Sequence, residues 1–313
     1  MNSALQPQIQ HLTCAHPGGL HKIAYREWFD ASTGPKEAAR VVVCVHGLTR
    51  RATDFDTLAR RMAGRGWRVV CPDMIGRGDS DWMTHPMFYD VPQYVADCVT
   101  LVARLGVESV DWVGTSMGGL IGMTYAALSG NPIRRMVLND IGPKLEWAGL
   151  STIATYVGSV PVFTEYAEAA NWLRSRMIAF GPHDEAGWEQ LIRPYFKVLP
   201  DGGFTPHYDP AIAIPFKALA QGGESGGGSG GESSGKPGGG SEAFSMWPLW
   251  DAISSNTLVL RGSLSELLSI ETCEGMKVRG PKARVIEIEG VGHAPSLIAP
   301  EQTDPILEFF SEQ

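Results

Sequence analysis

Short apolar runs alternate with amphipathic segments along most of the chain, which is typical of a protein built from alternating strands and helices. The run Val-Val-Val-Cys-Val at 41–45 is rich in β-branched residues, as expected for a strand that is covered on both faces. The segment 92–105 begins at a proline and places its apolar side chains at helical spacings of three and four. Strands are predicted at 21–28, 41–45, 67–71, 110–113, 136–139, 257–260 and 284–288, and helices after residue 53, at 92–105, after residue 116 and at 303–310.

This order of elements predicts an α/β fold with a mostly parallel central sheet and helices on both faces. The alternation stops between residues 143 and 250, where aromatic residues and helical stretches predominate. We interpret residues 143–250 as a helical cap over the carboxyl ends of the strands, and residues 1–142 and 251–313 as the core. Within the cap, residues 222–241 are rich in glycine and serine and predict a flexible loop, because such a composition cannot offset its ordering entropy.

Net charge and hydropathy disfavour two classes of protein, those that bind nucleic acids and those that span a membrane. The 313 residues carry a formal net charge of −8, which disfavours a nucleic-acid partner. No apolar run approaches the roughly 20 residues that span a bilayer, and the amino-terminal residues do not resemble a secretory signal, so we expect a cytoplasmic protein without a membrane partner. The five cysteines are scattered and are expected to be buried apolar residues, and no cysteine or histidine spacing predicts a metal site. The oligomeric state stays open.

One stretch, Val110-Asp-Trp-Val-Gly-Thr-Ser-Met-Gly-Gly119, predicts a buried strand, a sharp turn and a helix with a serine at the tip. Ser116 would project its hydroxyl out of the sheet there, and a Cβ at Gly114 or Gly118 would clash with neighbouring chain. The pattern G-x-S-x-G also occurs at 223–227 and 227–231, but no strand precedes those copies and no helix follows them. The context therefore indicates Ser116 as the nucleophile.

Three further motifs each follow a predicted strand. His46-Gly47 follows the strand 41–45, a carboxylate follows Arg261-Gly262, and Gly-Val-Gly-His-Ala-Pro follows the last predicted strand, where His293 is a candidate general base. Together with Gly-Thr-Ser-Met-Gly-Gly, these motifs resemble the α/β-hydrolase fold family over nearly the whole chain, more weakly in the cap. The resemblance implies a serine hydrolase that needs no cofactor, most often a carboxylesterase, with its triad in the order serine, acid, histidine.

The resemblance leaves two candidates for the acid. The family pattern puts an aspartate about six residues beyond the strand that ends near Leu260, and this chain has Glu266 there. Glutamate can orient an imidazole and offset its charge, so Glu266 is our first choice. Asp140, at the end of the preceding strand, is the alternative, because some relatives place the acid there.

The remaining site assignments concern the oxyanion and the substrate. The backbone N–H groups of Leu48 and Met117 are expected to form the oxyanion hole, with His46 holding the loop. Trp82 and Met74, which follow the strand 67–71, are candidate substrate-binding residues.

We predict hydrolysis of carboxylic esters through an acyl-enzyme, and the aromatic cap favours a small or medium, partly apolar substrate. The same triad would also serve lactones, hydroxyacyl oligoesters, thioesters and C–C bonds. A different class is also compatible with an intact triad: a ligand receptor on a hydrolase scaffold that turns over slowly. Epoxide or halide opening is disfavoured, because relatives of that type carry a carboxylate at the position of Ser116. Sustained turnover of p-nitrophenyl esters would favour the enzyme over the receptor.

Overall fold

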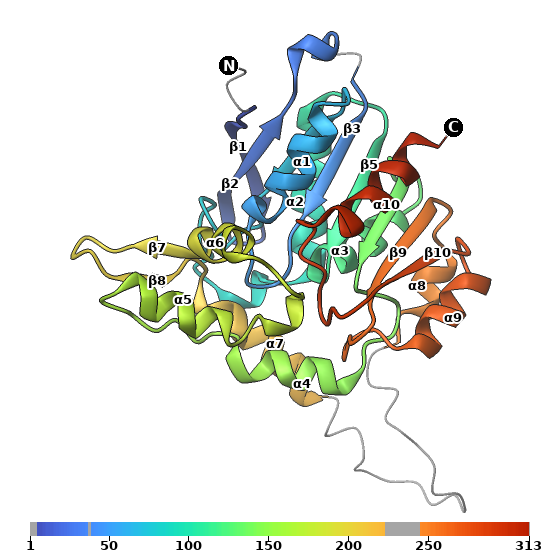
Figure 1. The fold of residues 1–313 in the computed structure, drawn as a ribbon. Coiled ribbons are helices and arrows are strands. Elements are labelled where there is room, and N and C mark those ends of the chain that lie inside the picture. Colours follow the sequence, from blue (N-terminus) through green and yellow to red (C-terminus); the bar gives the residue numbers. More distant parts are fainter. Residues whose placement is uncertain (1–4, 37–38, 223–244, 313) are drawn as a thin grey trace, which may run out of the picture.

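An eight-stranded sheet runs through the molecule in the order β1-β2-β4-β3-β5-β6-β9-β10 (Figure 1). The computed structural model describes residues 5–36, 39–222 and 245–312. The strands of this sheet are β1 (Gln8–His16), β2 (Gly19–Trp28), β3 (Val41–Val45), β4 (Arg68–Pro72), β5 (Val110–Thr115), β6 (Ile133–Asn139), β9 (Asn256–Gly262) and β10 (Arg284–Ile288).

The sheet is parallel from β4 to β10, and β1 and β2 are joined to it in antiparallel pairing. This confirms the predicted fold class, with parallel strands that bring their carboxyl ends to one edge. Strand β1 was not predicted, because the apolar residues in its first six positions, Ile9 and Leu12, are three apart and so show neither an alternating pattern nor an apolar run.

Alternate residues of β3 enter two different hydrophobic clusters, which shows that both faces of the sheet are covered. Val41, Val43 and Val45 belong to the cluster that includes residues of α2 and α3. Val42 and Cys44 belong to the cluster that includes residues of α1 and α10. The helices that cover the sheet are α1 (Asp56–Ala63), α2 (Val91–Leu105), α3 (Met117–Ala126), α8 (Trp247–Asp251), α9 (Ile270–Val278) and α10 (Pro300–Ser311).

The chain between β6 and β9 contributes most of the elements that lie beyond the carboxyl ends of the strands, at the bottom left of Figure 1. They are α4 (Trp147–Tyr156), α5 (Tyr166–Arg174), α6 (Glu185–Ile192), α7 (Ala213–Gly222) and the two-stranded sheet of β7 (Phe196–Val198) and β8 (Phe204–Pro206). The division into a core and a cap at residues 143–250 stays a prediction. The predicted glycine-rich loop lies outside the described residues apart from Gly222, which ends α7.

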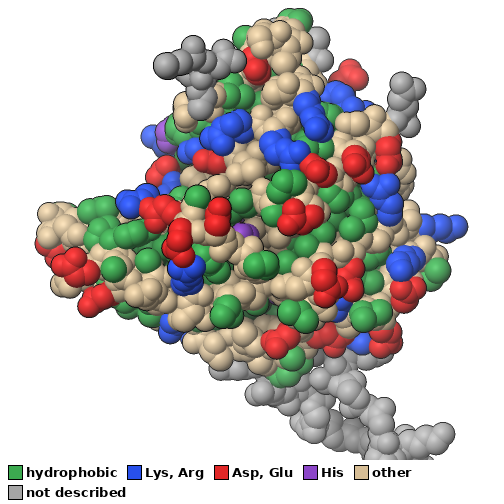
Figure 2. Space-filling model, viewed as in Figure 1, with side chains coloured by type: hydrophobic (Ala, Val, Ile, Leu, Met, Phe, Trp, Pro, Cys, Tyr) green, Lys and Arg blue, Asp and Glu red, His purple; other side chains and the backbone are tan. Residues whose placement is uncertain are grey.

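Acidic and basic side chains are interspersed over the face drawn in Figure 2, without a large field of one sign. Among the residues that the structure describes, none of the helices has the length and apolar character needed to cross a membrane.

Candidate active site

The predicted nucleophile lies on a sharp turn between β5 and α3. Ser116 has φ of 52° and ψ of −115°, a backbone conformation that a side-chain-bearing residue rarely adopts and that the surrounding structure must hold in place. Glycine is required on both sides of it. A Cβ on Gly118 would lie 1.9 Å from the carbonyl oxygen of Val45, and one on Gly114 would lie 2.3 Å from the carbonyl oxygen of Gly118. The strand, the turn and the helix pack too closely for any other residue.

A continuous chain of hydrogen bonds links Ser116, His293 and Asp140. The Nε2 atom of His293 lies 2.8 Å from the Oγ atom of Ser116, and its Nδ1 atom lies 2.7 Å from Oδ2 of Asp140. Because a carboxylate only accepts hydrogen bonds, Nδ1 carries the proton and Nε2 is left to accept the proton of the serine hydroxyl. The imidazole therefore has the tautomer that a general base needs.

The carboxylate beside His293 belongs to Asp140, and this corrects our first choice of Glu266. Glu266 is exposed and its carboxylate accepts a hydrogen bond from Thr152 at 3.3 Å, while both ring nitrogens of His293 already have other partners. Glu266 has the expected spacing after β9, but its side chain points to solvent. The alternative that the sequence left open, Asp140, is the residue that the fold brings to the histidine.

Asp140 is fully buried and is held by donors from the loop that follows β9. The backbone N–H of Gly262 donates to its Oδ1 at 2.8 Å, and the hydroxyl of Ser265 donates to its Oδ2 at 2.5 Å. These neutral donors and the imidazole satisfy the carboxylate without a cationic side chain, so its charge is directed at His293. Asp140 also has φ of 56°, which turns its side chain away from the path of β6.

Asn139, the residue before Asp140, ties the three loops of the site together. Its carbonyl oxygen accepts the N–H of Ser116 at 3.0 Å, and its side-chain amide donates to Thr115 Oγ1 at 3.0 Å and to the carbonyl of Pro295 at 2.8 Å. The ends of β5 and β6 and the loop that carries His293 are thus fixed to one another. Sequence reasoning missed this residue, because a buried asparagine at a strand end has no pattern of its own.

The two predicted oxyanion donors lie beside Ser116. Met117 is the first residue of α3, where an N–H has no partner within the helix. The carbonyl of Gly47 is held by Nδ1 of His46 at 2.8 Å and by the N–H of Arg50 at 3.1 Å. In a trans peptide the N–H points opposite to the carbonyl, so these bonds fix the direction of the Leu48 N–H.

His46 acts in this loop as a buried, neutral ring. Its Nε2 accepts the N–H of Met74 at 2.9 Å, which leaves the proton on Nδ1 for the carbonyl of Gly47. Burial, assisted by the charge of Arg77, lowers the pKa of His46 to about 3. This agrees with the structural role that the sequence suggested for His46.

Two cavities meet at Ser116. We call the one lined by His293 the imidazole-side cavity and the one lined by Met117, whose N–H is a proposed oxyanion donor, the amide-side cavity. The imidazole-side cavity has a volume of about 80 Å³ and is lined by Arg50, Asp54, Trp172, Arg176, Tyr195 and His293, among others. The amide-side cavity has a volume of about 530 Å³ and is lined mainly by apolar side chains, including those of Met117, Leu120, Ile141, Leu145, Leu150 and Phe216. Leu48 and Ser116 line both cavities, so a substrate carbonyl placed between them would lie next to the hydroxyl.

Neither predicted substrate-binding residue lines these cavities. Met74 is fully buried in the core, and Trp82 is 44% exposed with the ammonium group of Lys197 4.9 Å from its ring centroid. The structure thus places neither residue at the cavities beside Ser116, because the loop after β4 turns Met74 into the core and Trp82 to solvent. The residues that line the imidazole-side cavity come from the loop after β3, from the serine turn, from the loop that carries His293 and from residues 153–195. The position of residues 153–195 over the sheet depends on tertiary packing.

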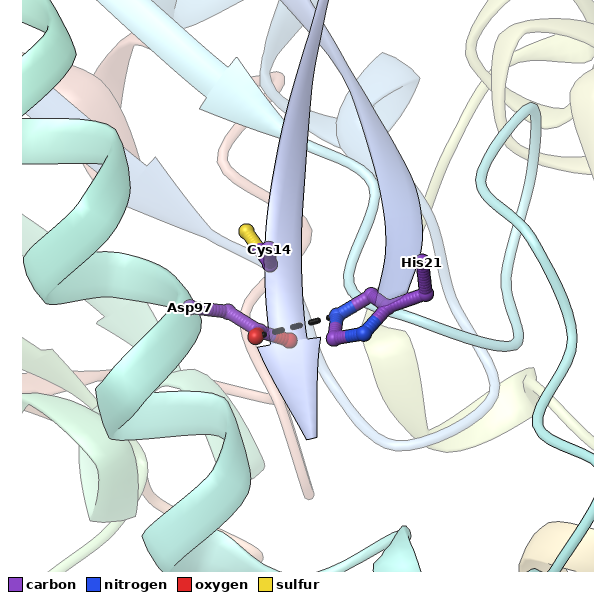
Figure 3. Close-up of side chains that lie close together, drawn as sticks. All are labelled: Cys14, His21 and Asp97. Carbon is purple, nitrogen blue, oxygen red and sulfur yellow. Dashed lines mark hydrogen bonds and ion pairs between the residues drawn. The ribbon is translucent and has the colours of Figure 1, made fainter. Parts of the chain in front are cut away.

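Away from Ser116, three side chains that could hold a metal ion lie together between β1, β2 and α2 (Figure 3). The side chains of Cys14 in β1, His21 in β2 and Asp97 in α2 are buried, and their donor atoms lie within 4.8 Å of one another. Nε2 of His21 and the side-chain amide of Gln93 both contact Oδ1 of Asp97, at 3.0 and 2.9 Å. Burial, together with Asp97, raises the pKa of Cys14 to about 12, so its sulfur keeps the proton. We therefore read this group as a buried hydrogen-bonded contact between β1, β2 and α2.

The sheet, the strained serine turn and the ordered imidazole define a hydrolase of the α/β class. The model of the Alpha/beta hydrolase family matches residues 42–309, so the chain belongs to this family. As the sequence predicted, it is an enzyme that hydrolyses carboxylic esters.

Individual relatives agree with this assignment. The chain is 41% identical over 308 residues to the 3-hydroxybutyrate-oligomer hydrolase of Cupriavidus necator, covering 97% of this chain and 98% of that protein. A crystal structure of an alpha/beta hydrolase from Novosphingobium aromaticivorans superposes with a TM-score of 0.80 at 34% identity, covering 97% of this chain and 98% of the other. The 2-hydroxy-6-oxo-2,4-heptadienoate hydrolase of Pseudomonas putida is 33% identical over 128 residues, which is 40% of this chain and 46% of that protein.

Proposed function

We propose that Ser116, His293 and Asp140 form a catalytic triad that hydrolyses short oligoesters of hydroxy acids. The observation that carries this proposal is the hydrogen-bonded chain from the serine hydroxyl through the imidazole to the buried carboxylate. A serine hydroxyl is a weak nucleophile until a base takes its proton, and His293 is placed to do so.

In the first half of the reaction, Oγ of Ser116 bonds to the ester carbonyl carbon while Nε2 of His293 takes the hydroxyl proton. Asp140 holds the ring and stabilises the imidazolium that forms. The carbonyl oxygen becomes an anion, which the N–H groups of Leu48 and Met117 stabilise as the oxyanion hole. The bond to the leaving alcohol then breaks, and His293 gives its proton to the departing oxygen.

In the second half, water attacks the acyl-enzyme. His293 takes a proton from the water as it bonds to the acyl carbon, and returns a proton to Oγ of Ser116 as that ester bond breaks. The products are one acid and one alcohol, and the enzyme is restored without a cofactor.

The substrate class rests on one relative that matches nearly the whole chain and on the cavities. The relative from Cupriavidus necator is named for 3-hydroxybutyrate oligomers, in which each ester joins two short hydroxy acids. The amide-side cavity offers apolar walls for the acyl part, and residues 143–250, acting as a cap, would supply much of the wall. We infer that this enzyme cleaves the same class of ester.

The test compares wild type with Ser116→Ala on p-nitrophenyl butyrate and on the dimer of 3-hydroxybutyrate. Loss of the nucleophile should lower kcat by about 10⁴-fold or more. Ser225→Ala is the matched control, because Ser225 lies in another copy of the G-x-S-x-G pattern, and it should retain full activity. Labelling by a fluorophosphonate that persists in Ser116→Ala would contradict the assignment. A single slow burst in place of sustained turnover would favour the ligand receptor.

A further inference from the structure

The two cavities at Ser116 differ in which part of an ester they can receive. His293 gives its proton to the leaving oxygen, so the leaving alcohol must lie on the side of the imidazole. The imidazole-side cavity is lined by His293, whereas Met117, a proposed oxyanion donor, lines the amide-side cavity. The leaving alcohol therefore enters the imidazole-side cavity and the acyl chain enters the amide-side cavity.

The imidazole-side cavity carries two guanidinium groups and one carboxylate near the reaction centre. Arg50 is buried and its charge is already compensated, because Asp54 accepts two hydrogen bonds from it at 2.6 and 2.7 Å. The carbonyl of Leu191 and the ring of Tyr195 fill the remaining sides of this guanidinium. Arg50 thus contributes shape and polarity to the wall, and little net charge.

Arg176 differs from Arg50 in having no carboxylate within 4.0 Å among the residues that the structure describes. It lies in the turn after α5 and is exposed, and its guanidinium carbon lies 4.2 Å from the ring centroid of Trp172. A hydrogen bond of 2.9 Å to the carbonyl of Trp172 fixes it further. A planar cation that is held in place at the wall of a cavity suits a carboxylate, which it can bind with two parallel hydrogen bonds.

The size of the imidazole-side cavity limits what can accompany that carboxylate. At about 80 Å³ it is the smaller of the two cavities, which favours a short leaving unit. The amide-side cavity is several times larger and can take a longer acyl chain.

Building on the proposed function, we propose that Arg176 binds the free carboxylate of the leaving hydroxy acid. The enzyme then removes one hydroxy-acid unit at a time from the carboxyl end of an oligoester. In a 3-hydroxy acid the leaving oxygen and the carboxylate belong to the same short unit, so a group that is protonated by His293 can at the same time contact Arg176. Arg176 is a specificity-determining residue in this proposal and takes no part in bond breaking.

The experiment compares the 3-hydroxybutyrate trimer with its methyl ester, which lacks the carboxylate charge. Wild type should have a kcat/KM about tenfold or more higher for the free acid, mainly through KM, because the contact is an ionic hydrogen bond made on binding. Arg176→Gln should remove this preference, so that the ratio of kcat/KM for the free acid to kcat/KM for the methyl ester falls to about one. Arg176→Lys should keep part of the preference. The preference should shrink with added salt, since Arg176 is exposed.

Arg174→Gln is the matched control. Arg174 is the last residue of α5, two positions before Arg176, but it pairs with Glu185 and does not line the imidazole-side cavity. This variant should keep the full preference for the free acid. Equal loss of the preference for the free acid in Arg174→Gln and Arg176→Gln would overturn the proposal. Such a result would show that removing any positive charge from this region has the same effect.

Product analysis tests the direction of cleavage. A tetramer labelled in its carboxyl-terminal unit should release labelled monomer first, and early release of dimer or of unlabelled monomer would contradict the proposal. If Arg176 variants behave as wild type while Ser116→Ala is inactive on all esters, only the role of Arg176 fails and the triad stands. If wild type hydrolyses no ester, the proposed function itself fails.

Discussion

Asp140 shows how much one backbone angle decides in this site. Its φ of 56° and its burial aim the carboxylate at His293, whereas Glu266 has the spacing that the family resemblance favours and an exposed side chain. Ser116 and His293 could be predicted because a strand, a glycine turn and the following element are visible in the sequence. The sequence could not decide between Asp140 and Glu266 as the acid, because the positive φ of Asp140 does not change the pattern of hydrophobic residues.

The choice of acid can be tested by two isosteric changes. Asp140→Asn should lower kcat by about 10⁴-fold, because an amide favours the wrong tautomer of His293. Glu266→Gln should leave kcat within about twofold of wild type, since exposed polar changes have small effects. Steady-state kinetics on p-nitrophenyl butyrate measure both. The reverse result would restore Glu266 as the acid.

A second residue-scale prediction concerns pH. The pKa of His46 is about 3 in the folded state and ordinarily near 6.5, so the unfolded chain binds the proton first as the pH falls. The stabilisation from the neutral ring is complete above pH 6.5 and is lost progressively towards pH 3. Between pH 6.5 and 5 this residue alone should lower the free energy of unfolding by about 2 kcal/mol.

Urea unfolding at several pH values measures how steeply the free energy of unfolding falls with falling pH. His46→Gln should have a shallower slope than wild type, whatever its stability at neutral pH. His207, whose pKa burial lowers to about 4, acts in the same direction, so the difference between the two proteins isolates His46. Identical pH dependence in the two proteins would show that folding does not lower the pKa of His46.

Among the elements, the hairpin of β1 and β2 is joined to α2 by buried polar contacts as well as by apolar packing. His21 and Gln93 share Oδ1 of Asp97, and all three residues are buried. Figure 3 shows the contact between His21 and Asp97. The inner strands β3, β5 and β6 were predicted from their apolar runs. The contact of Cys14, His21 and Asp97 was not predicted, because Asp97 is far from the other two in sequence and is brought to them by the packing of α2 against β1.

Truncating this carboxylate should destabilise the hairpin without changing the chemistry. Asp97→Ala leaves His21 and Gln93 buried without their acceptor, which should cost about 1–3 kcal/mol in the free energy of unfolding. The kcat/KM of the folded variant should stay near the wild-type value, because three strands, β2, β4 and β3, lie between β1 and β5 in the sheet. Chemical denaturation and ester hydrolysis measure the two effects. A large loss of kcat in fully folded Asp97→Ala would argue for a role in the reaction.

In the molecule as a whole, one sheet separates two hydrophobic clusters, of which one extends to the cavities at Ser116. The cluster with α2 and α3 extends to residues that line the cavities at Ser116, while the cluster with α1 and α10 lies on the opposite face. Arg40 and Arg135 donate to the carbonyls of Phe310 and Phe309 and so join α10 to the sheet. The sequence predicted α10 from its apolar spacing, but not which face of the sheet it covers.

Phe310 offers a test of this separation. Its ring is fully buried in the cluster with α1 and α10, so Phe310→Ala should lower the free energy of unfolding by about 3–5 kcal/mol. At temperatures where the variant is folded, kcat and KM should match wild type. Thermal unfolding followed by circular dichroism gives the first quantity. Altered KM in the folded variant would indicate that the two faces are coupled.

The placement of two cavities around a single hydroxyl also has a kinetic consequence. Once the first product has left, the covalently held acyl group still fills one cavity and the other is empty. Whatever small hydroxyl compound enters that empty space competes with water for the acyl group. Added alcohols that fit there should therefore appear as new esters among the products, and the ratio of ester to acid would report how readily each alcohol occupies the vacated space.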